Sequence, residues 1–130
     1  MIFSIAVHGA PYSSQSAHSA LRFAEAALQA GHSIHRVFFY HDGVRTADAL
    51  GVAPQDELDV HAAWVQLQRS SGIELAVCIA TALKRGMLSQ EEADRYEKTS
   101  ASIDPSFSIV GLGQLIEAVT ASDRFVTFAA

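Results

Sequence analysis

The alternation of strand-like and helix-like segments constrains the fold of this 130-residue chain more than any other feature of its sequence. Short runs rich in β-branched and aromatic residues alternate with segments that have the three- and four-residue apolar spacing of an amphipathic helix. The strand-like runs are apolar on both faces, which is typical of a parallel sheet covered by helices on both sides. The predicted strands are Ile2–Val7, Ile34–Tyr40, Ile73–Cys78, Phe107–Val110 and Arg124–Phe128.

Capping and turn residues help to place the helices. Ser13 or Ser14 can cap a helix that runs to about Ala30, and Ser89 with Glu92 forms a capping box before a helix from about Gln90 to Lys98. Further helices are predicted over Leu58–Arg69, directly after Cys78 as far as Arg85, and over Gln114–Ala121, with a short helical turn within Val44–Leu50. No repeat or linker interrupts the pattern, so residues 1–130 are expected to form one domain.

Composition narrows the classes of function. Hydrophobic residues make up 49% of the chain and charged residues 18%, as in a folded globular protein. A formal net charge of −5 argues against direct binding of nucleic acid. The chain contains no apolar run of the roughly 20 residues that cross a membrane, and its amino terminus has the pattern of a first strand. A single cysteine excludes an internal disulfide, so we expect a cytoplasmic protein.

The only cysteine, Cys78, stands where a predicted strand gives way to a short helix. The first backbone N–H groups of a helix lack internal partners and carry partial positive charge, so we expect the thiolate form to be stabilised there. In a parallel sheet the carboxyl ends of all strands lie along one edge. That edge would gather the loops His8–Tyr12, His41–Gly43 and Gly111–Gly113 around Cys78, and we expect the thiol to be exposed among them.

Several kinds of chemistry compete for a lone thiol, and an inert buried cysteine is the plainest alternative. A cysteine hydrolase needs a histidine held against the thiol. His8 and His41 can reach the same edge, but the sequence pairs neither with Cys78. A thioredoxin-like cycle needs a second, resolving cysteine, which is absent. A persulfide carrier needs only one thiol, and it obtains sulfur from one molecule and passes it to another.

Neither a metal nor a cofactor is predicted. The six histidines show no HxxxH or HxH spacing that would place two metal ligands on one element. Gly111-Leu112-Gly113 suggests a dinucleotide loop, but the third glycine of that motif would fall at Ile116. A tight turn is the better interpretation of this segment.

Four motifs together resemble the DsrE/TusD-type sulfur-relay family, and they extend over nearly the whole chain. They are the turn Gly9–Tyr12 with Gln15 beyond it, the stretch Phe38–Val44, the cysteine segment Val77–Gly86 and the turn Val110–Leu115. The resemblance implies a three-layer α/β/α sandwich with a five-stranded, mainly parallel sheet.

The resemblance also implies a cysteine that carries persulfide sulfur, and this maps onto Cys78 alone. It implies a heterohexamer with TusB/TusC-like (DsrH/DsrF-like) subunits, a TusA-like sulfur donor and a TusE/DsrC-like acceptor. The sulfur would serve 2-thiolation of the tRNA wobble uridine or, in the other branch of the family, sulfur oxidation.

The resulting hypothesis is a sulfurtransferase subunit in which Cys78 is the persulfide intermediate and Tyr12, His41, Gly111 and Gly113 form the rim of its pocket. Tyr12 could close over the thiol and His41 could supply a proton, although a structural role fits both residues as well. The alternatives are a non-catalytic scaffold subunit with a buried Cys78, and a binder of small ligands or nucleotides at the same edge.

Overall fold

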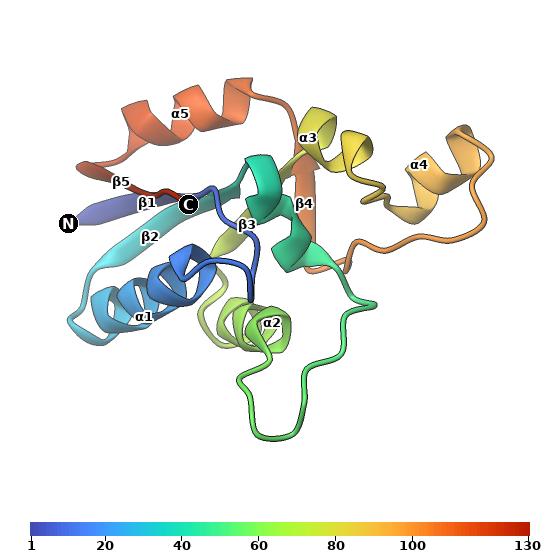
Figure 1. Cartoon of the computed structure of the whole chain (residues 1–130). Coiled ribbons are helices and arrows are strands. Elements are labelled where there is room, and N and C mark those ends of the chain that lie inside the picture. The colour runs from blue at the N-terminus through green and yellow to red at the C-terminus, as the bar shows by residue number, and fades with distance from the viewer.

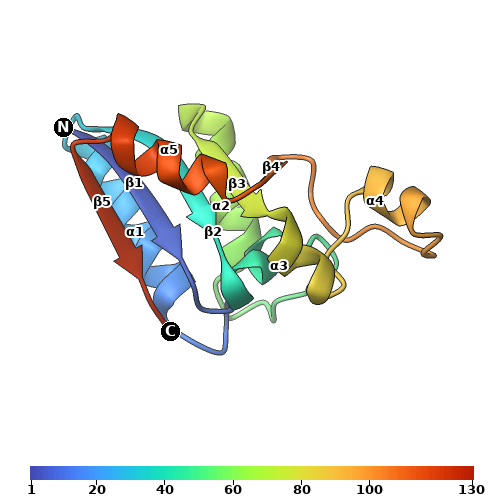
Figure 2. The ribbon, with the colours of Figure 1, turned by 90° about the horizontal axis from the view of Figure 1, so that it is seen from above.

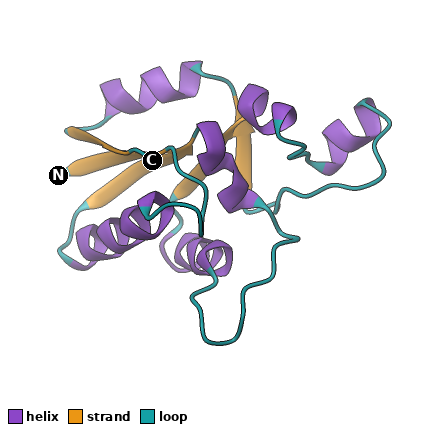
Figure 3. Cartoon of the chain, viewed as in Figure 1, coloured by secondary structure: helices purple, strands orange, loops and turns teal.

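The computed structural model describes residues 1–130 as a five-stranded, entirely parallel sheet with helices on both sides (Figure 1; Figure 3). The strands are β1 (Ile2–Val7), β2 (Ser33–Phe39), β3 (Glu74–Cys78), β4 (Phe107–Val110) and β5 (Arg124–Phe128), in the order β4-β3-β2-β1-β5. The helices are α1 (Ser16–Gln29), α2 (Val60–Ser71), α3 (Ile79–Lys84), α4 (Gln90–Arg95) and α5 (Gly113–Ala121), and a 3-10 helix, η1, spans His41–Ala47. The predicted α/β fold is confirmed, and the sheet is parallel throughout.

Helices α1 and α2 cover one face of the sheet, called here the α1/α2 face, and α5 lies on the other, the α5 face (Figure 1). Buried strand residues from β1, β2 and β3 point alternately to the two faces, as the two-residue period of a strand requires. The α1/α2 face holds a cluster of 21 buried residues. Trp64 of α2 lies at its centre, packed edge-on against Phe39 with ring centroids 5.4 Å apart.

The α5 face has a much smaller core. Only Phe38, Ala76 and Cys78 form its buried apolar cluster, with Tyr40, Val110 and Leu115 packed against it. Two polar residues, Ser4 and Arg36, are also buried, and the register of the strands places both on this face. Seen from above, α5 runs across the strands as the single helix over the middle of this face (Figure 2).

Side-chain caps and turn residues set the helix boundaries. Asp59 caps α2 by accepting a hydrogen bond from the Ala62 N–H, and Gly72 ends it with a left-handed φ of 74°. Half of the predicted capping box is confirmed: Ser89 caps α4 by accepting from the Glu92 N–H, but the Glu92 carboxylate contacts Arg95 instead of the Ser89 N–H, and the helix ends at Arg95 rather than near Lys98. The prediction for α1 is confirmed in part: the Ser14 hydroxyl accepts from the N–H of Ser16, the first residue of the helix, at 3.1 Å, although the cap position itself is Gln15, whose side chain makes no capping hydrogen bond.

Helix α4 projects from the body of the molecule (Figure 1; Figure 2). The segments before and after α4 are joined by hydrogen bonds from the N–H groups of Ser102 and Ile103 to the Leu88 carbonyl, at 2.8 and 3.0 Å. None of the helices combines the length and the apolar character needed to cross a membrane.

Candidate functional site

The carboxyl edge of the sheet brings three predicted site segments into one row. Val7 is in register with Phe39, and Phe39 with Val77, so the next residues along these strands are His8, Tyr40 and Cys78. Cys78 itself is in register with Val110 of β4. The predicted position of Cys78 at the junction of a strand and a helix is confirmed, since β3 ends at Cys78 and α3 begins at Ile79.

The expectation that the Cys78 thiol is exposed is wrong, because the residue is only 1% exposed. Its side chain points onto the α5 face together with Ala76, two residues earlier on β3. There it is covered by the small cluster that includes Phe38, with Tyr40 and Leu115 packed on its outside. A sulfur donor can therefore reach the thiol only if part of this cover moves.

Tyr40, Val110 and Leu115 belong to the site, although the motifs that contain them did not identify them as site residues. A signal was present for two of them. Tyr40 is two residues beyond the buried Phe38, which puts both on the same face of the sheet, and Val110 is the last apolar residue of its strand. Leu115 is part of the motif Val110–Leu115, but its contact with the Cys78 cluster depends on how α5 packs on the sheet, which the sequence does not show.

Cys78 occupies the cap position of α3 with an extended backbone, at φ −67° and ψ 120°, and its side chain makes no capping hydrogen bond. The Thr81 hydroxyl donates to the Cys78 carbonyl at 3.3 Å, which ties the first turn of the helix to the end of β3. Helix α3 has only six residues, so its dipole gives less stabilisation to an anion than a long helix would.

His41 lies at the start of η1, beside Tyr40, with their ring centroids 4.1 Å apart. The ring of His8 is 5.1 Å from that of His41 and 5.9 Å from that of Tyr40. Burial, followed by the nearby charge of His41, lowers the pKa of His8 below its ordinary value. The structure thus brings His41 to the group that covers Cys78, together with His8 as a second imidazole.

A salt bridge joins η1 to α3 beside this histidine pair. The Arg85 Nε donates to Asp42 Oδ1 at 2.7 Å, and Arg85 Nη1 donates to the Thr81 carbonyl at 3.1 Å. The hydrogen bond from Arg85 lowers the pKa of the exposed Asp42 carboxyl. These contacts hold the segment that follows β2 against the helix that follows Cys78.

Tyr12 has its hydroxyl bound elsewhere. The hydroxyl donates to the Leu58 carbonyl at 3.3 Å and accepts from the Val60 N–H at 3.0 Å, at the start of α2. Tyr12 lines two small cavities of about 360 and 180 Å³, and Cys78 lines neither.

Gly111 lies in the exposed turn between β4 and α5, and the exposed Gly113 is the first residue of α5. A β-carbon added at either position would meet nothing within 4 Å. The turn therefore does not need glycine for space. It follows Val110, the register partner of Cys78.

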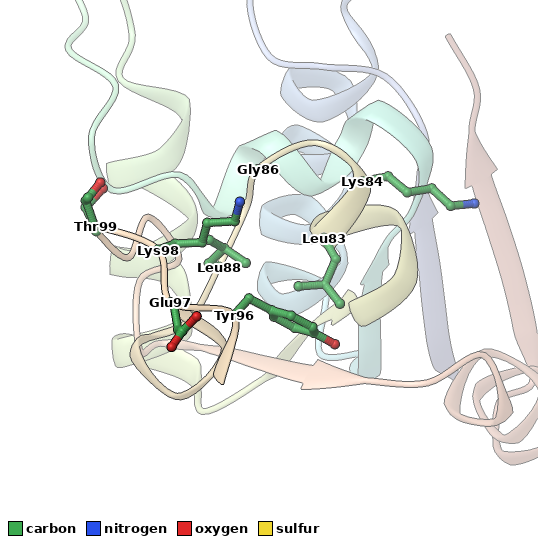
Figure 4. Close-up of a pocket in the computed structure, with 9 residues that line it drawn as sticks. Leu83, Lys84, Gly86, Leu88, Tyr96, Glu97, Lys98 and Thr99 are labelled. Carbon is green, nitrogen blue, oxygen red and sulfur yellow. The ribbon is translucent and has the colours of Figure 1, made fainter. Parts of the chain in front are cut away.

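A cavity of about 880 Å³ lies between α3 and the segment that follows α4, and Cys78 does not line it (Figure 4). Leu83 and Tyr96 face this cavity from opposite sides, whereas the Lys84 side chain extends away from them. No group of three or more His, Cys, Asp or Glu side chains is arranged to hold a metal ion.

The fold and the site define a class of parallel α/β domains with one thiol at the carboxyl edge of the sheet. Within this class the chain matches the DsrE/DsrF-like family over residues 1–128, and it belongs to that family. The predicted resemblance is confirmed.

Relatives of known name extend over the whole chain. It is 49% identical over 128 residues to the Pseudomonas aeruginosa "Sulfurtransferase TusD homolog", which covers 98% of this chain and 97% of that protein. It is 43% identical to the Allochromatium vinosum "Putative sulfurtransferase DsrE", over 98% of both chains. Similarity of this extent to proteins named sulfurtransferases supports a sulfurtransferase activity.

A solved structure supports the fold independently. The crystal structure of the ychN protein from E. coli superposes with a TM-score of 0.76 at 22% identity, covering 98% of this chain and 99% of that one. At this identity the likeness concerns the fold alone.

Proposed function

We propose that this chain is a sulfurtransferase subunit that carries sulfur as a persulfide on Cys78. One observation supports the proposal most strongly: the only thiol of the chain ends β3 at the carboxyl edge of the sheet, where open α/β folds bind their ligands. The full-length similarity to proteins named sulfurtransferases supports the same chemistry.

The proposed reaction moves one sulfur atom without net oxidation or reduction. The Cys78 thiolate attacks the terminal sulfur of a donor persulfide, R–S–SH. The sulfur–sulfur bond of the donor breaks, and its thiolate leaves with the proton that Cys78 gave up. The products are R–SH and Cys78–S–SH. In the second half, an acceptor thiolate attacks the outer sulfur of Cys78–S–SH and restores the Cys78 thiol.

Because the chain has one cysteine, donor and acceptor must be other molecules. We propose a TusA-like donor, a TusE/DsrC-like acceptor and a heterohexamer with TusB/TusC-like subunits, acting in 2-thiolation of the tRNA wobble uridine in the cytoplasm. The same relay in sulfur oxidation is the alternative. Exposed apolar side chains on α5 and at its cap are consistent with subunit contacts: the cap residue Leu112 is 47% exposed, Ile116 67% and Val119 48%.

The rim of the site is proposed on unequal grounds. His41 contacts Tyr40, which packs over the Cys78 cluster, and the turn Gly111–Gly113 follows Val110, the register partner of Cys78. Both are suited to guide a donor to the thiol, and His41 can supply a proton to a leaving thiolate. Tyr12 has weaker support. It follows a strand at the same edge of the sheet as His41 and the glycine turn, but its hydroxyl is hydrogen-bonded at the start of α2.

Intact-mass measurement tests the proposal directly. The protein is incubated with a small-molecule persulfide donor, and an added mass of one sulfur atom is expected on the wild type but not on Cys78→Ser. No adduct on the wild type, or an equal adduct on the variant, would falsify the proposal.

A non-catalytic scaffold subunit is the second candidate, and the 1% exposure of Cys78 favours it. The two differ in how the native thiol reacts. A carrier must open often enough for Cys78 to react with a small alkylating reagent well before global unfolding. A scaffold has no such need, so its thiol should react only when the whole domain unfolds.

A further inference from the structure

Arg36 is a buried cation on the α5 face, and the proposed reaction does not use it. Its side chain is 8% exposed. Nε donates to Glu74 Oε2 at 2.6 Å and Nη2 to Glu74 Oε1 at 3.3 Å, a two-pronged contact with β3. Nη1 donates to the Gln114 carbonyl of α5 at 2.9 Å and also to Glu117. Arg36 therefore connects two strands of the sheet to the first turns of α5.

The contact with Gln114 matters because the next residue is Leu115. Leu115 is the α5 side chain that packs against the cluster containing Cys78. The position of the Gln114 carbonyl fixes the peptide that leads into Leu115, so a hydrogen bond to that carbonyl also fixes the cover of the thiol.

The rest of α5 is held mainly at its other end. Ala118 is the only fully buried residue of the helix. Just past its carboxyl end, Ser122 shares a hydrogen bond with Ser4 at 2.5 Å, and Asp123 accepts from the Ile2 N–H at 2.7 Å. Without Arg36 the amino-terminal half of α5 would keep the packing of Leu115 and the exposed contact of Glu117 with His35, whereas the carboxyl end would stay attached through Ser122 and Asp123.

We propose that Arg36 is a positioning residue that holds the first turns of α5, with Leu115, over Cys78 and so sets how readily a sulfur donor reaches the thiol. We call the contacts of Arg36 with Gln114 and Glu117 of α5 the Arg36 clamp. Its importance for sulfur transfer rests on the proposed function, whereas its effect on access to the thiol can be measured independently of that function.

Arg36→Met is suited to test the clamp. Methionine keeps an apolar stem of similar length and removes every donor. The two carboxylates it leaves behind, Glu74 and Glu117, have side chains that are 36% and 45% exposed, so water can solvate them. Glu117 also keeps its contact with His35 at 2.9 Å. The variant is therefore expected to fold.

The experiment measures the rate at which iodoacetamide alkylates Cys78 in the native protein. Arg36→Met is expected to react about tenfold faster than the wild type, the factor that corresponds to one lost charge-assisted hydrogen bond closing the cover. Arg124→Met is the matched control, because Arg124 is exposed and bonds only the adjacent Asp123 carbonyl. Urea unfolding of each variant shows that the reaction precedes global unfolding.

Two further variants keep the test decisive if Arg36→Met is too unstable to handle. Leu115→Ala removes the α5 side chain that packs against the Cys78 cluster and should accelerate alkylation in the same way, and Arg36→Lys should give an intermediate rate. A rate equal to that of the wild type in Arg36→Met and Leu115→Ala overturns the clamp, as does an equal acceleration in Arg124→Met. Faster alkylation of Arg36→Met together with no sulfur adduct on the wild type would support the role of Arg36 and contradict the proposed function. An unchanged alkylation rate together with a sulfur adduct would contradict the role of Arg36 and support the proposed function.

Discussion

The two faces of the sheet differ in how much they bury and in what they bury. The α1/α2 face holds a cluster of 21 buried residues beneath two long helices, whereas the α5 face has a cluster of three beneath one helix of nine residues. Cys78 is on the small face. The hydrophobic effect scales with buried apolar area, so the large face supplies most of the stability. The small face can then open locally at low cost, which the proposed transfer of sulfur to the buried thiol requires.

Polar groups hold the small face where apolar area is lacking. Its buried Ser4 and Arg36 each bond α5 or the residues just past that helix. A hydrogen bond contributes about 1 kcal/mol and acts only over a narrow range of distance and angle. A small displacement of a helix held by such hydrogen bonds is therefore enough to break its contacts with the sheet. A helix packed into a deep apolar core would keep part of its contacts after the same displacement.

Trp64→Ala should have the largest effect and tests whether stability lies on the α1/α2 face. Trp64 is fully buried and contacts Phe39, so its loss should cost about 3–5 kcal/mol of unfolding free energy. Urea denaturation measures it. Ile116→Ala on the outside of α5 is the control and should change stability little, since Ile116 is 67% exposed. Equal losses in the two variants would contradict the division between the faces.

Gly43→Ala tests the close contact between η1 and the carboxyl end of β1. A β-carbon at Gly43 would lie 2.1 Å from the Val7 carbonyl oxygen, so β1 or η1 must shift, at an expected cost of about 2–3 kcal/mol. Gly111→Ala is the matched control, with nothing within 4 Å of the added carbon, and its thermal unfolding should match that of the wild type. If Gly43→Ala were as stable as its control, the close approach at this turn would be wrong.

Tyr40→Ala should change access to the thiol more than it changes stability. Tyr40 is only partly buried but packs on the Cys78 cluster, so we expect a loss of about 1–2 kcal/mol and faster alkylation of Cys78. Tyr40→Phe keeps the ring and should behave like the wild type in both assays. An unchanged alkylation rate in Tyr40→Ala would mean that the cover of the thiol is made by α5 alone.

Tyr12→Phe separates a structural role from a place at the rim. The hydroxyl bonds Leu58 and Val60, so its removal should cost about 1 kcal/mol in urea unfolding and leave sulfur uptake by Cys78 unchanged. Reduced uptake at unchanged stability would restore Tyr12 to the rim.

The sequence predicted what depends on local pattern. The parallel sheet followed from runs that are apolar on both faces, and the place of Cys78 followed from a strand that leads directly into helix formers. What it missed depends on contacts between distant segments. Arg36 bonds Glu117 across 81 positions, and Tyr12 bonds Val60 across 48. The burial of Cys78 belongs with these, because its cover comes partly from Leu115, which the chain places on α5.

Acid pH should reduce the stability of the two faces by protonating a different carboxylate on each, and these effects should be the smallest of those predicted here. Near the α1/α2 face, burial opposes ionisation of Asp104, but hydrogen bonds from Ser106 and His61 outweigh it and lower its pKa. On the α5 face, hydrogen bonds from His35 and Arg36 lower the pKa of Glu117. A carboxyl with a depressed folded pKa adds stability above its unfolded pKa and loses it as pH falls through the folded value.

Melting temperatures measured from pH 7 down to pH 3 should therefore decrease as the pH drops through the ordinary titration range of carboxyl groups and below it. Asp104→Asn and Glu117→Gln should each remove part of that fall, by no more than about 4 °C. Alkylation of Cys78 distinguishes the two carboxylates. Glu117 helps Arg36 to hold α5, so Glu117→Gln should raise the alkylation rate at neutral pH, whereas Asp104→Asn should not. An equal rise in both variants would mean that Cys78 becomes accessible by loosening of the whole domain rather than of its small face.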